Sequence, residues 1–144
     1  MRAIPSTLIA ACIAATAIAA CGPPKANTPI DQIPTLTKLT DVMDNQATVA
    51  DPEFKKIDQT SYTDADYAAF TTVSQRIQAT SLKIPDFASA YAKGSEPEFE
   101  ALATRLNEKA KALGAAAAGK DAPGSSAALK DMKSTCKECH SKFR

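Results

Sequence analysis

The chain of 144 residues contains no tryptophan, one histidine and four cysteines, and aromatic residues make up only 6% of it. No stretch alternates apolar and polar residues as a half-buried β-strand would, which argues against a sheet. Alanine is abundant, and the apolar residues recur at helical spacing. The length allows one domain with a sizeable core. The sequence therefore predicts an all-α fold.

The chain also lacks a marked excess of either positive or negative charge. The chain has 17 Lys and Arg against 16 Asp and Glu, and Arg2 lies in an N-terminal leader, so the remaining chain is balanced. Proteins that bind nucleic acids normally carry a basic surplus or a basic patch. We therefore expect no nucleic-acid partner.

The longest apolar run lies at the N-terminus and resembles the leader of a bacterial lipoprotein. Arg2 supplies a positive end, residues 4–20 are mostly apolar, and the small residues Ala19 and Ala20 precede Cys21. This resemblance to a lipobox implies cleavage before Cys21 and acylation of that residue. The alternatives are an ordinary secretory signal and a membrane span. A span needs about 20 apolar residues, which this run barely reaches.

The sequence divides into three parts. Residues 1–20 form the lipoprotein signal peptide, residues 21–34 form a lipidated Pro-rich tether, and residues 35–144 form the folded domain. Two or more acyl chains give stable anchoring where one chain would not. We expect a lipid-anchored protein facing the bacterial periplasm. Gly22 rather than Asp follows the cysteine, so analogy with enterobacterial sorting favours the outer membrane.

Helical periodicity predicts four long helices and one short helix in the domain. Asp51-Pro52 should end the first helix, Thr63 with Asp66 should cap the second, and Ser95 with Glu98 should cap the third. Asp121 to Gly124 reads as a turn. The expected helices cover residues 35–50, 63–81, 85–93, 95–119 and 125–143.

The last predicted helix places both remaining cysteines on the face that should point into the core. Cys12 leaves with the leader and Cys21 is acylated, so only Cys136 and Cys139 stay in the domain as thiols. Spacings of 3, 4, 3 and 4 residues give one stripe, typical of a helix in a bundle. The stripe consists of Leu129, Met132, Cys136, Cys139 and Phe143.

The segment Cys136-Lys-Glu-Cys139-His140 has the Cys-x-x-Cys-His spacing of a haem attachment site. On a helix the three side chains share an arc of roughly 100°, so two sulfurs can bond a porphyrin edge while the imidazole reaches the iron. A redox disulfide usually opens a helix beside a strand, and no strand is predicted here. A zinc site needs four ligands, and the two thiols with His140 make three.

This motif at the extreme C-terminus, on the last helix of a four-helix chain, resembles the cytochrome c prime family, the class II cytochromes c. Class I cytochromes c carry the motif near the N-terminus instead. The resemblance implies an antiparallel four-helix bundle with one covalent haem c, with His140 as the proximal iron ligand and the first helix over the distal face. It also implies that Phe143 and Arg144 lie in the haem pocket, and that the chain forms a homodimer through its first two helices, as members of that family often do.

Two residues of the first helix are candidates for the distal pocket. If Met43 ligates the iron, the haem is six-coordinate and suits electron transfer with a redox partner protein. If Leu39 packs over the iron, the site is five-coordinate and suits binding of nitric oxide or carbon monoxide. Met43 could also be core filler. We do not expect an enzyme, because the iron takes the only histidine and no pair of carboxylates is recognisable as a catalytic site.

The leader generates the first testable prediction. Cys21→Ala should release the protein from membranes or block its processing, because the acyl chains would have no attachment point. Membrane fractionation with mass spectrometry of the mature N-terminus measures both effects. A mature N-terminus without acyl groups would contradict the prediction.

Overall fold

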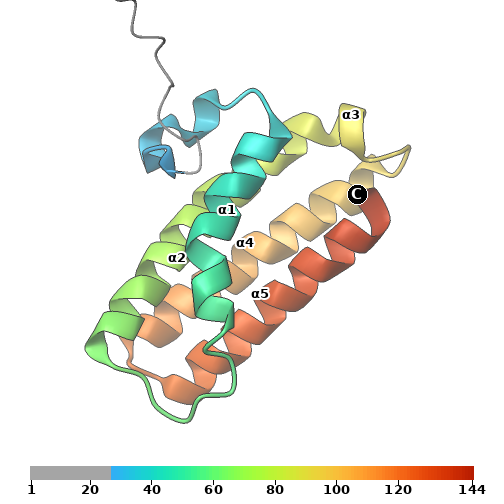
Figure 1. Cartoon of the computed structure of the whole chain (residues 1–144). Helices are drawn as coiled ribbons and strands as arrows, with labels where there is room; N and C mark the ends of the chain where they lie inside the picture. The colour runs from blue at the N-terminus through green and yellow to red at the C-terminus, as the bar shows by residue number, and fades with distance from the viewer. Residues whose placement is uncertain (1–26) are drawn as a thin grey trace, which may run out of the picture.

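The computed structural model describes residues 27–144, and the predicted signal peptide, Cys21 and most of the tether lie outside the described residues. Four long helices form the bundle and alternate in direction (Figure 1). Between residues 27 and 144 no strand occurs. The prediction of an all-α four-helix bundle is confirmed. The long helices are α1 (Leu39–Phe54), α2 (Asp64–Lys83), α4 (Glu96–Ala118) and α5 (Ala122–Phe143).

Three short elements connect or precede the long helices. The 3-10 helix η2 (Ile30–Thr35) precedes α1, and the 3-10 helix η3 (Ile84–Phe87) runs directly into α3 (Ala88–Tyr91). The short helix expected at 85–93 is therefore one 3-10 turn followed by one α-helical turn. Pro85 lies in the first turn of η3, where its missing N–H leaves no hydrogen bond unmade.

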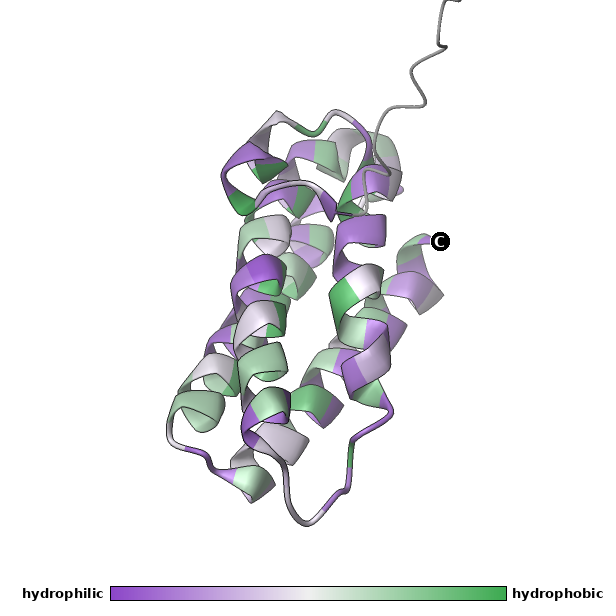
Figure 2. Ribbon diagram, turned by 60° about the vertical axis from the view of Figure 1, so that its left-hand side comes forward, coloured by the Kyte–Doolittle hydropathy of each residue, from purple (hydrophilic) through white to green (hydrophobic). Residues whose placement is uncertain are grey.

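The core lies along the seams between neighbouring helices. The most extensive contacts join α2 to α4 and α4 to α5, and α1 packs along α2. Hydrophobic and hydrophilic residues alternate around each long helix (Figure 2), as a helix with one buried face requires. Each large apolar side chain buried there contributes about 1.5–3 kcal/mol. The largest fully buried ones are Phe70, Ile77, Leu113, Leu129 and Met132.

One predicted helix cap is confirmed and another is wrong. The Thr63 hydroxyl accepts a hydrogen bond from the Asp66 N–H at 3.2 Å, and the Asp66 carboxylate accepts one from the Thr63 N–H at 2.8 Å. Ser95 makes no such side-chain bond. Its backbone carbonyl instead accepts from the N–H groups of Glu98 and Phe99, which begins α4 without the help of the hydroxyl.

Two predicted helix ends are also wrong. Helix α1 continues through Pro52 to Phe54, because a proline in the last turn removes only one intrahelical bond. Helix α5 begins at Ala122, so the expected turn at residues 121–124 is its first turn. There the Asp121 carboxylate accepts from the Gly124 N–H at 3.0 Å, which is the bond of an N-cap.

The segment before α1 packs on the bundle, although residues up to 34 were predicted to belong to a tether. Ile33 in η2 is fully buried and Leu36 is 8% exposed. The main contacts of η2 are with α2. The folded domain therefore includes part of the predicted tether, and α1 starts at Leu39 rather than at Thr35. None of the helices within residues 27–144 is long and apolar enough to cross a bilayer.

The close approach of α4 to α2 gives a stability prediction. A Cβ atom on Gly114 would lie 2.5 Å from the Ser74 Oγ, which donates a buried hydrogen bond of 2.7 Å to the Ala110 carbonyl. Gly114→Ala should lower the free energy of unfolding by about 1–3 kcal/mol through overpacking, although alanine is the better helix former. Denaturant unfolding measures this change, and adding Ser74→Gly should recover part of it. A Gly114→Ala variant more stable than the wild type would contradict the prediction.

Candidate functional site

The C-terminal half of α5 carries the predicted site, and its apolar face becomes more open along the helix. Leu129 and Met132 are fully buried. One and two turns further on, Cys136 and Cys139 are half-buried, and both are free thiols. The stripe of spacing 3, 4, 3 and 4 is thus confirmed as one face of the helix, with its last two turns incompletely covered by protein.

The uncovered face belongs to what we call the α1–α5 seam, defined by half-buried Leu39, Met43 and Phe54 on α1 with Cys136 and Phe143 on α5. Helices α1 and α5 contact each other at few places. They lie close near the C-terminal end of α1 and diverge towards the C-terminus of α5 (Figures 1 and 2). The seam is therefore apolar but much less closely packed than the other seams of the bundle.

Single contacts mark the two ends of the α1–α5 seam. At the narrow end, the Lys133 ammonium lies 5.9 Å from the centre of the Phe54 ring, within reach of a cation–π attraction. At the wide end, the Phe143 ring meets Phe99 of α4 edge to face, with 5.2 Å between ring centres. The Phe99 contact holds the last turn of α5 against α4 and away from α1.

Ion pairs hold the same part of α5 on α4. Arg105 pairs with Glu138, and Lys142 pairs with Glu98. Lys109 and Asp131 form a third pair at 2.9 Å. Exposed pairs of this kind stabilise by at most about 1 kcal/mol each. Together they fix the side of α5 that faces α4, so that the two thiols lie on the side facing α1.

Burial keeps both thiols in the neutral form. It raises the pKa of the Cys136 thiol to about 11, with smaller contributions from the negative charge that Cys139 would carry and from Asp51. Burial also raises the pKa of Cys139, and Glu138 adds to the effect. The neutral thiols contribute fully to the stability of the fold at a pH below the thiol pKa of the unfolded chain. This contribution is lost as the pH rises through the higher thiol pKa of the folded chain. At neutral pH both sulfurs carry their protons.

His140 lies at the open edge of the seam and is exposed. Partial shielding lowers the pKa of its imidazole, and the positive charge of Arg144 lowers it further. The Arg144 N–H donates to the His140 carbonyl at 3.2 Å, and the Lys93 ammonium donates to the Arg144 carbonyl at 3.3 Å. The lowered pKa favours the neutral imidazole, which is the form that ligates a metal.

These residues fit a covalently held haem. Two free thiols stand one turn apart on one helix face, an exposed imidazole follows directly, and the facing seam is lined by half-buried apolar side chains. A flat apolar macrocycle needs this combination of attachment points, axial ligand and incompletely packed wall. Among residues 27–144, no three His, Cys, Asp or Glu side chains are arranged to hold a metal by themselves.

A helical bundle with such a motif on its last helix defines a class of protein, the c-type haem proteins. The family model described as Cytochrome C' matches residues 37–144. Because this match covers most of the chain, the protein belongs to the cytochrome c prime family, as the C-terminal motif indicated. Members of this family carry covalent haem c, typically one per chain, are generally not enzymes and are typically periplasmic. No curated protein and no solved structure matches the chain.

The structure brings together most of the residues that the sequence singled out. Cys136, Cys139 and Phe143 share one face of α5, and Arg144 lies beside His140. Leu39 and Met43 are both half-buried on α1. Their roles towards iron stay predictions.

Sequence reasoning missed several residues around the site. Phe54 lies outside all the predicted helices, yet it belongs to the last turn of α1 and is part of the seam. Asp51 was predicted only to help end the first helix, yet its negative charge contributes to the raised pKa of the Cys136 thiol. Arg105 had no local signal at all, because its partner Glu138 is 33 residues away in the sequence.

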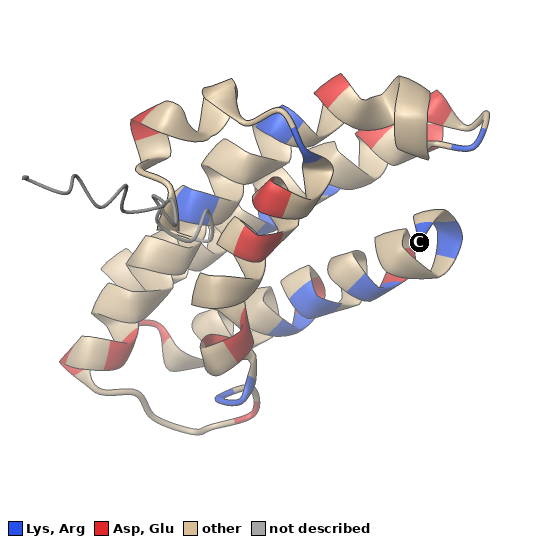
Figure 3. Cartoon of the chain, turned by 45° about the horizontal axis from the view of Figure 1, so that its top comes forward, with Lys and Arg blue, Asp and Glu red and all other residues tan. Residues whose placement is uncertain are grey.

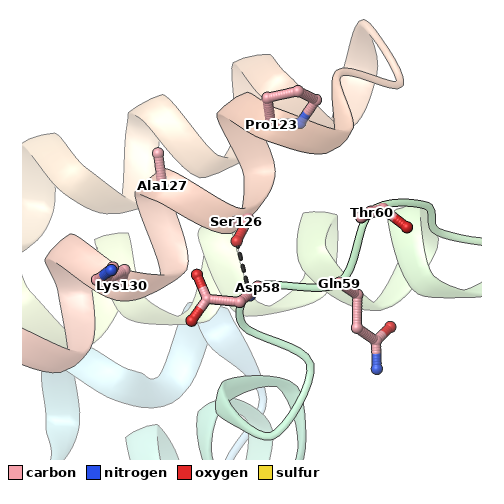
Figure 4. Close-up of a pocket in the computed structure, with 7 residues that line it drawn as sticks. All are labelled: Asp58, Gln59, Thr60, Pro123, Ser126, Ala127 and Lys130. Atoms are coloured by element: carbon pink, nitrogen blue, oxygen red, sulfur yellow. Dashed lines mark hydrogen bonds between the residues drawn. The ribbon is translucent and has the colours of Figure 1, made fainter.

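A concave region lies at the opposite end of α5, between its first turns and the loop after α1 (Figure 4). There the Asp58 N–H donates to the Ser126 hydroxyl at 2.9 Å, and Lys130 and Pro123 form part of the wall. This region is open and contains neither a thiol nor an imidazole, so it has none of the chemistry of the predicted site.

The two thiols generate the next prediction. The double variant Cys136→Ala with Cys139→Ala should lose all haem that survives acid–acetone extraction, since thioether bonds need both sulfurs. Absorbance of the extracted protein measures the retained haem. Met132→Leu, a change one turn earlier on the same stripe, should keep it. Full retention in the double variant would contradict the attachment site.

Proposed function

We propose that the protein is a membrane-anchored cytochrome that transfers electrons in the periplasm. Cys136 and Cys139 would hold the haem c by thioether bonds, and His140 would be the proximal ligand of the iron. When bound, the haem supplies a one-electron iron couple. The observation that carries the proposal is the α1–α5 seam, an apolar and incompletely packed wall facing two neutral thiols and a neutral imidazole.

The chain would contribute three physical effects to this function. The two covalent bonds and the contact between Phe99 and Phe143 would fix the orientation of the group relative to α4. The apolar residues Leu39, Met43 and Phe54 would exclude water from one face. Low polarity around a haem disfavours the more highly charged ferric state and raises the reduction potential.

The edge of α5 beside the motif supports exchange with a protein partner. Figure 3 shows Lys and Arg residues along the outer side of α5. Lys142 is held in ion pairs with Glu98 and Glu138, whereas exposed Lys137 lies between the two cysteines and has no ion pair within residues 27–144. A redox partner with an acidic surface would be attracted to this cation at low salt.

The proposal also includes the absence of enzymatic activity and a lipid anchor on Cys21. His140 is the only histidine of the chain, so no second imidazole is present for proton transfer. The small residues before Cys21 at the end of an apolar run support acylation. The anchor would attach the cytochrome to the periplasmic face of a membrane, with the outer membrane favoured by Gly22.

The alternative function is the binding of nitric oxide or carbon monoxide at a five-coordinate iron. Half-buried Leu39, one turn before Met43 on α1, favours this candidate, because a branched apolar side chain over the iron would admit only small uncharged ligands. The two functions differ in one property, which is whether Met43 binds the iron as a sixth ligand.

The ferric absorption spectrum tests this property. Under the electron-transfer proposal the wild type should be low-spin with Met43 bound, and Met43→Leu should become high-spin. The reduction potential should then fall by on the order of 100 mV, since axial ligands tune haem potentials over about 0.8 V. Met132→Leu, which changes the buried methionine of α5, is the matched control and should leave the spectrum unchanged. A high-spin wild type unaffected by Met43→Leu would favour gas binding instead.

A further inference from the structure

Two exposed carboxylates border the α1–α5 seam on α1. Asp44 and Asp51 lie about 80–100° round this helix from Met43, on the side away from its buried residues. The negative charge of Asp51 contributes to the raised pKa of Cys136 on the opposite helix, so this carboxylate lies close to the seam. We call Asp44 and Asp51 the acidic rim.

Two exposed cations border the same seam on α5. Lys137 and Arg144 lie about 80–100° round this helix from Cys136, again on the side away from its buried residues. We call Lys137 and Arg144 the basic rim. Figure 3 shows acidic residues of α1 and basic residues of α5 turned to the same side of the molecule. The open seam is therefore flanked by charges of opposite sign.

The two rims do not neutralise each other within one chain. Among residues 27–144, no ion pair includes a side chain of either rim, and none joins α1 to α5. By contrast, the cations Arg105 and Lys142 between α4 and α5 are bound to Glu138 and Glu98. The rims are therefore available to a second molecule.

The two rims match in length and in position along the bundle. Each rim spans seven residues of its helix, which is about 10 Å. The helices run antiparallel (Figure 1), and the contact between Phe54 and Lys133 fixes their register. Counting three residues back from Phe54 and four residues on from Lys133 places Asp51 and Lys137 at heights that differ by about 2 Å. The other ends of the two rims then also lie at similar heights.

A second copy of the chain is complementary to these rims. A two-fold rotation about an axis parallel to the seam places the acidic rim of each copy opposite the basic rim of the other, at the same height. Asp51 of one copy then faces Lys137 of the other, and Asp44 faces Arg144. Because such a contact is isologous, each of these pairs forms twice. A two-fold axis across the seam would instead place like charges opposite each other.

We propose that the acidic and basic rims form a docking surface for a second copy of this chain, with seam facing seam. The proposal names a partner for the proposed function and rests on it, because the pairing brings together the two seams in which the haem would lie. In the exchange that follows, a ferrous copy loses one electron and a ferric copy gains it, so no other reactant is consumed. Exposed ion pairs are individually weak, so the encounter is transient, as electron-transfer complexes usually are.

Crosslinking of the holoprotein in nonionic detergent tests the docking surface. Chains with and without heavy nitrogen are mixed in equal amounts, and a carbodiimide joins carboxylates to amines in contact. Mass spectrometry then identifies the crosslinks between a heavy and a light chain, which only contact between copies produces. We expect Asp51 joined to Lys137 at low salt. This product should fall about tenfold at about 1 M salt, where charges are screened beyond about 3 Å.

Charge reversal tests the pairing of the rims. The rate of electron exchange between ferric and ferrous copies is measured by magnetisation transfer in half-reduced samples. Lys137→Glu and Asp51→Lys should each lower this rate about tenfold at low salt, because like charges then face each other. The double variant should recover the rate, since opposite charges face each other again. Lys111→Glu, the same charge change at an exposed position of α4, should leave the rate unchanged.

Two results would overturn the docking surface. One is the absence of heavy–light crosslinks between the rims at low salt, and the other is a double variant that exchanges electrons no faster than the single variants. Heavy–light crosslinks that join α1 only to α2 would indicate a dimer through the first two helices and would overturn it as well. Crosslinked rims without any electron exchange would support the docking surface and overturn the proposed electron transfer, so the two failures are distinguishable.

Discussion

The attachment of the C-terminal half of α5 to α4 is the constraint on which the rest of the structure depends. A flat group between α1 and α5 requires that these helices do not close on each other, so the last helix must be held from its other side. Phe143 packs on Phe99, and the ion pairs of Arg105 and Lys142 add polar contacts to α4. The buried residues Leu129 and Met132 close the opposite half of α5 into the core. The N-terminal half of α5 is thus tightly packed, whereas its C-terminal half is only partly covered. The motif lies in the C-terminal half.

The electrostatic state of the motif follows from this partial burial. The thiols are shielded enough that their protons are retained, and the raised pKa of Cys136 and the lowered pKa of His140 have the same leading cause, the cost of placing charge in a poorly solvated seam. Neutral sulfurs and a neutral imidazole suit an apolar wall better than charged ones would. The partial burial of the seam therefore favours both cofactor attachment and iron ligation.

Much of the fold could be predicted because helix faces repeat with a period of 3.6 residues. The long helices, the capping box of Thr63 and the core stripe of α5 all follow from residues close in sequence. The errors lie at helix ends, where two local signals compete. Pro52 was read as a breaker although a last turn tolerates it, and Asp121 was read as a turn residue although it caps α5. At Ser95 the backbone alone begins the helix.

The sequence by itself determined the family, the cofactor chemistry and the helix that carries it, because Cys136, Cys139 and His140 lie within five residues and one helical turn relates them. Only the tertiary structure decided which side of α5 stays open, because the partners that hold it, Glu98 and Arg105, are more than thirty residues away. The same holds for Thr28, which the sequence placed in a free tether. Asn45 and Arg76 bind it across 17 and 48 residues, and no local spacing encodes contacts of that range.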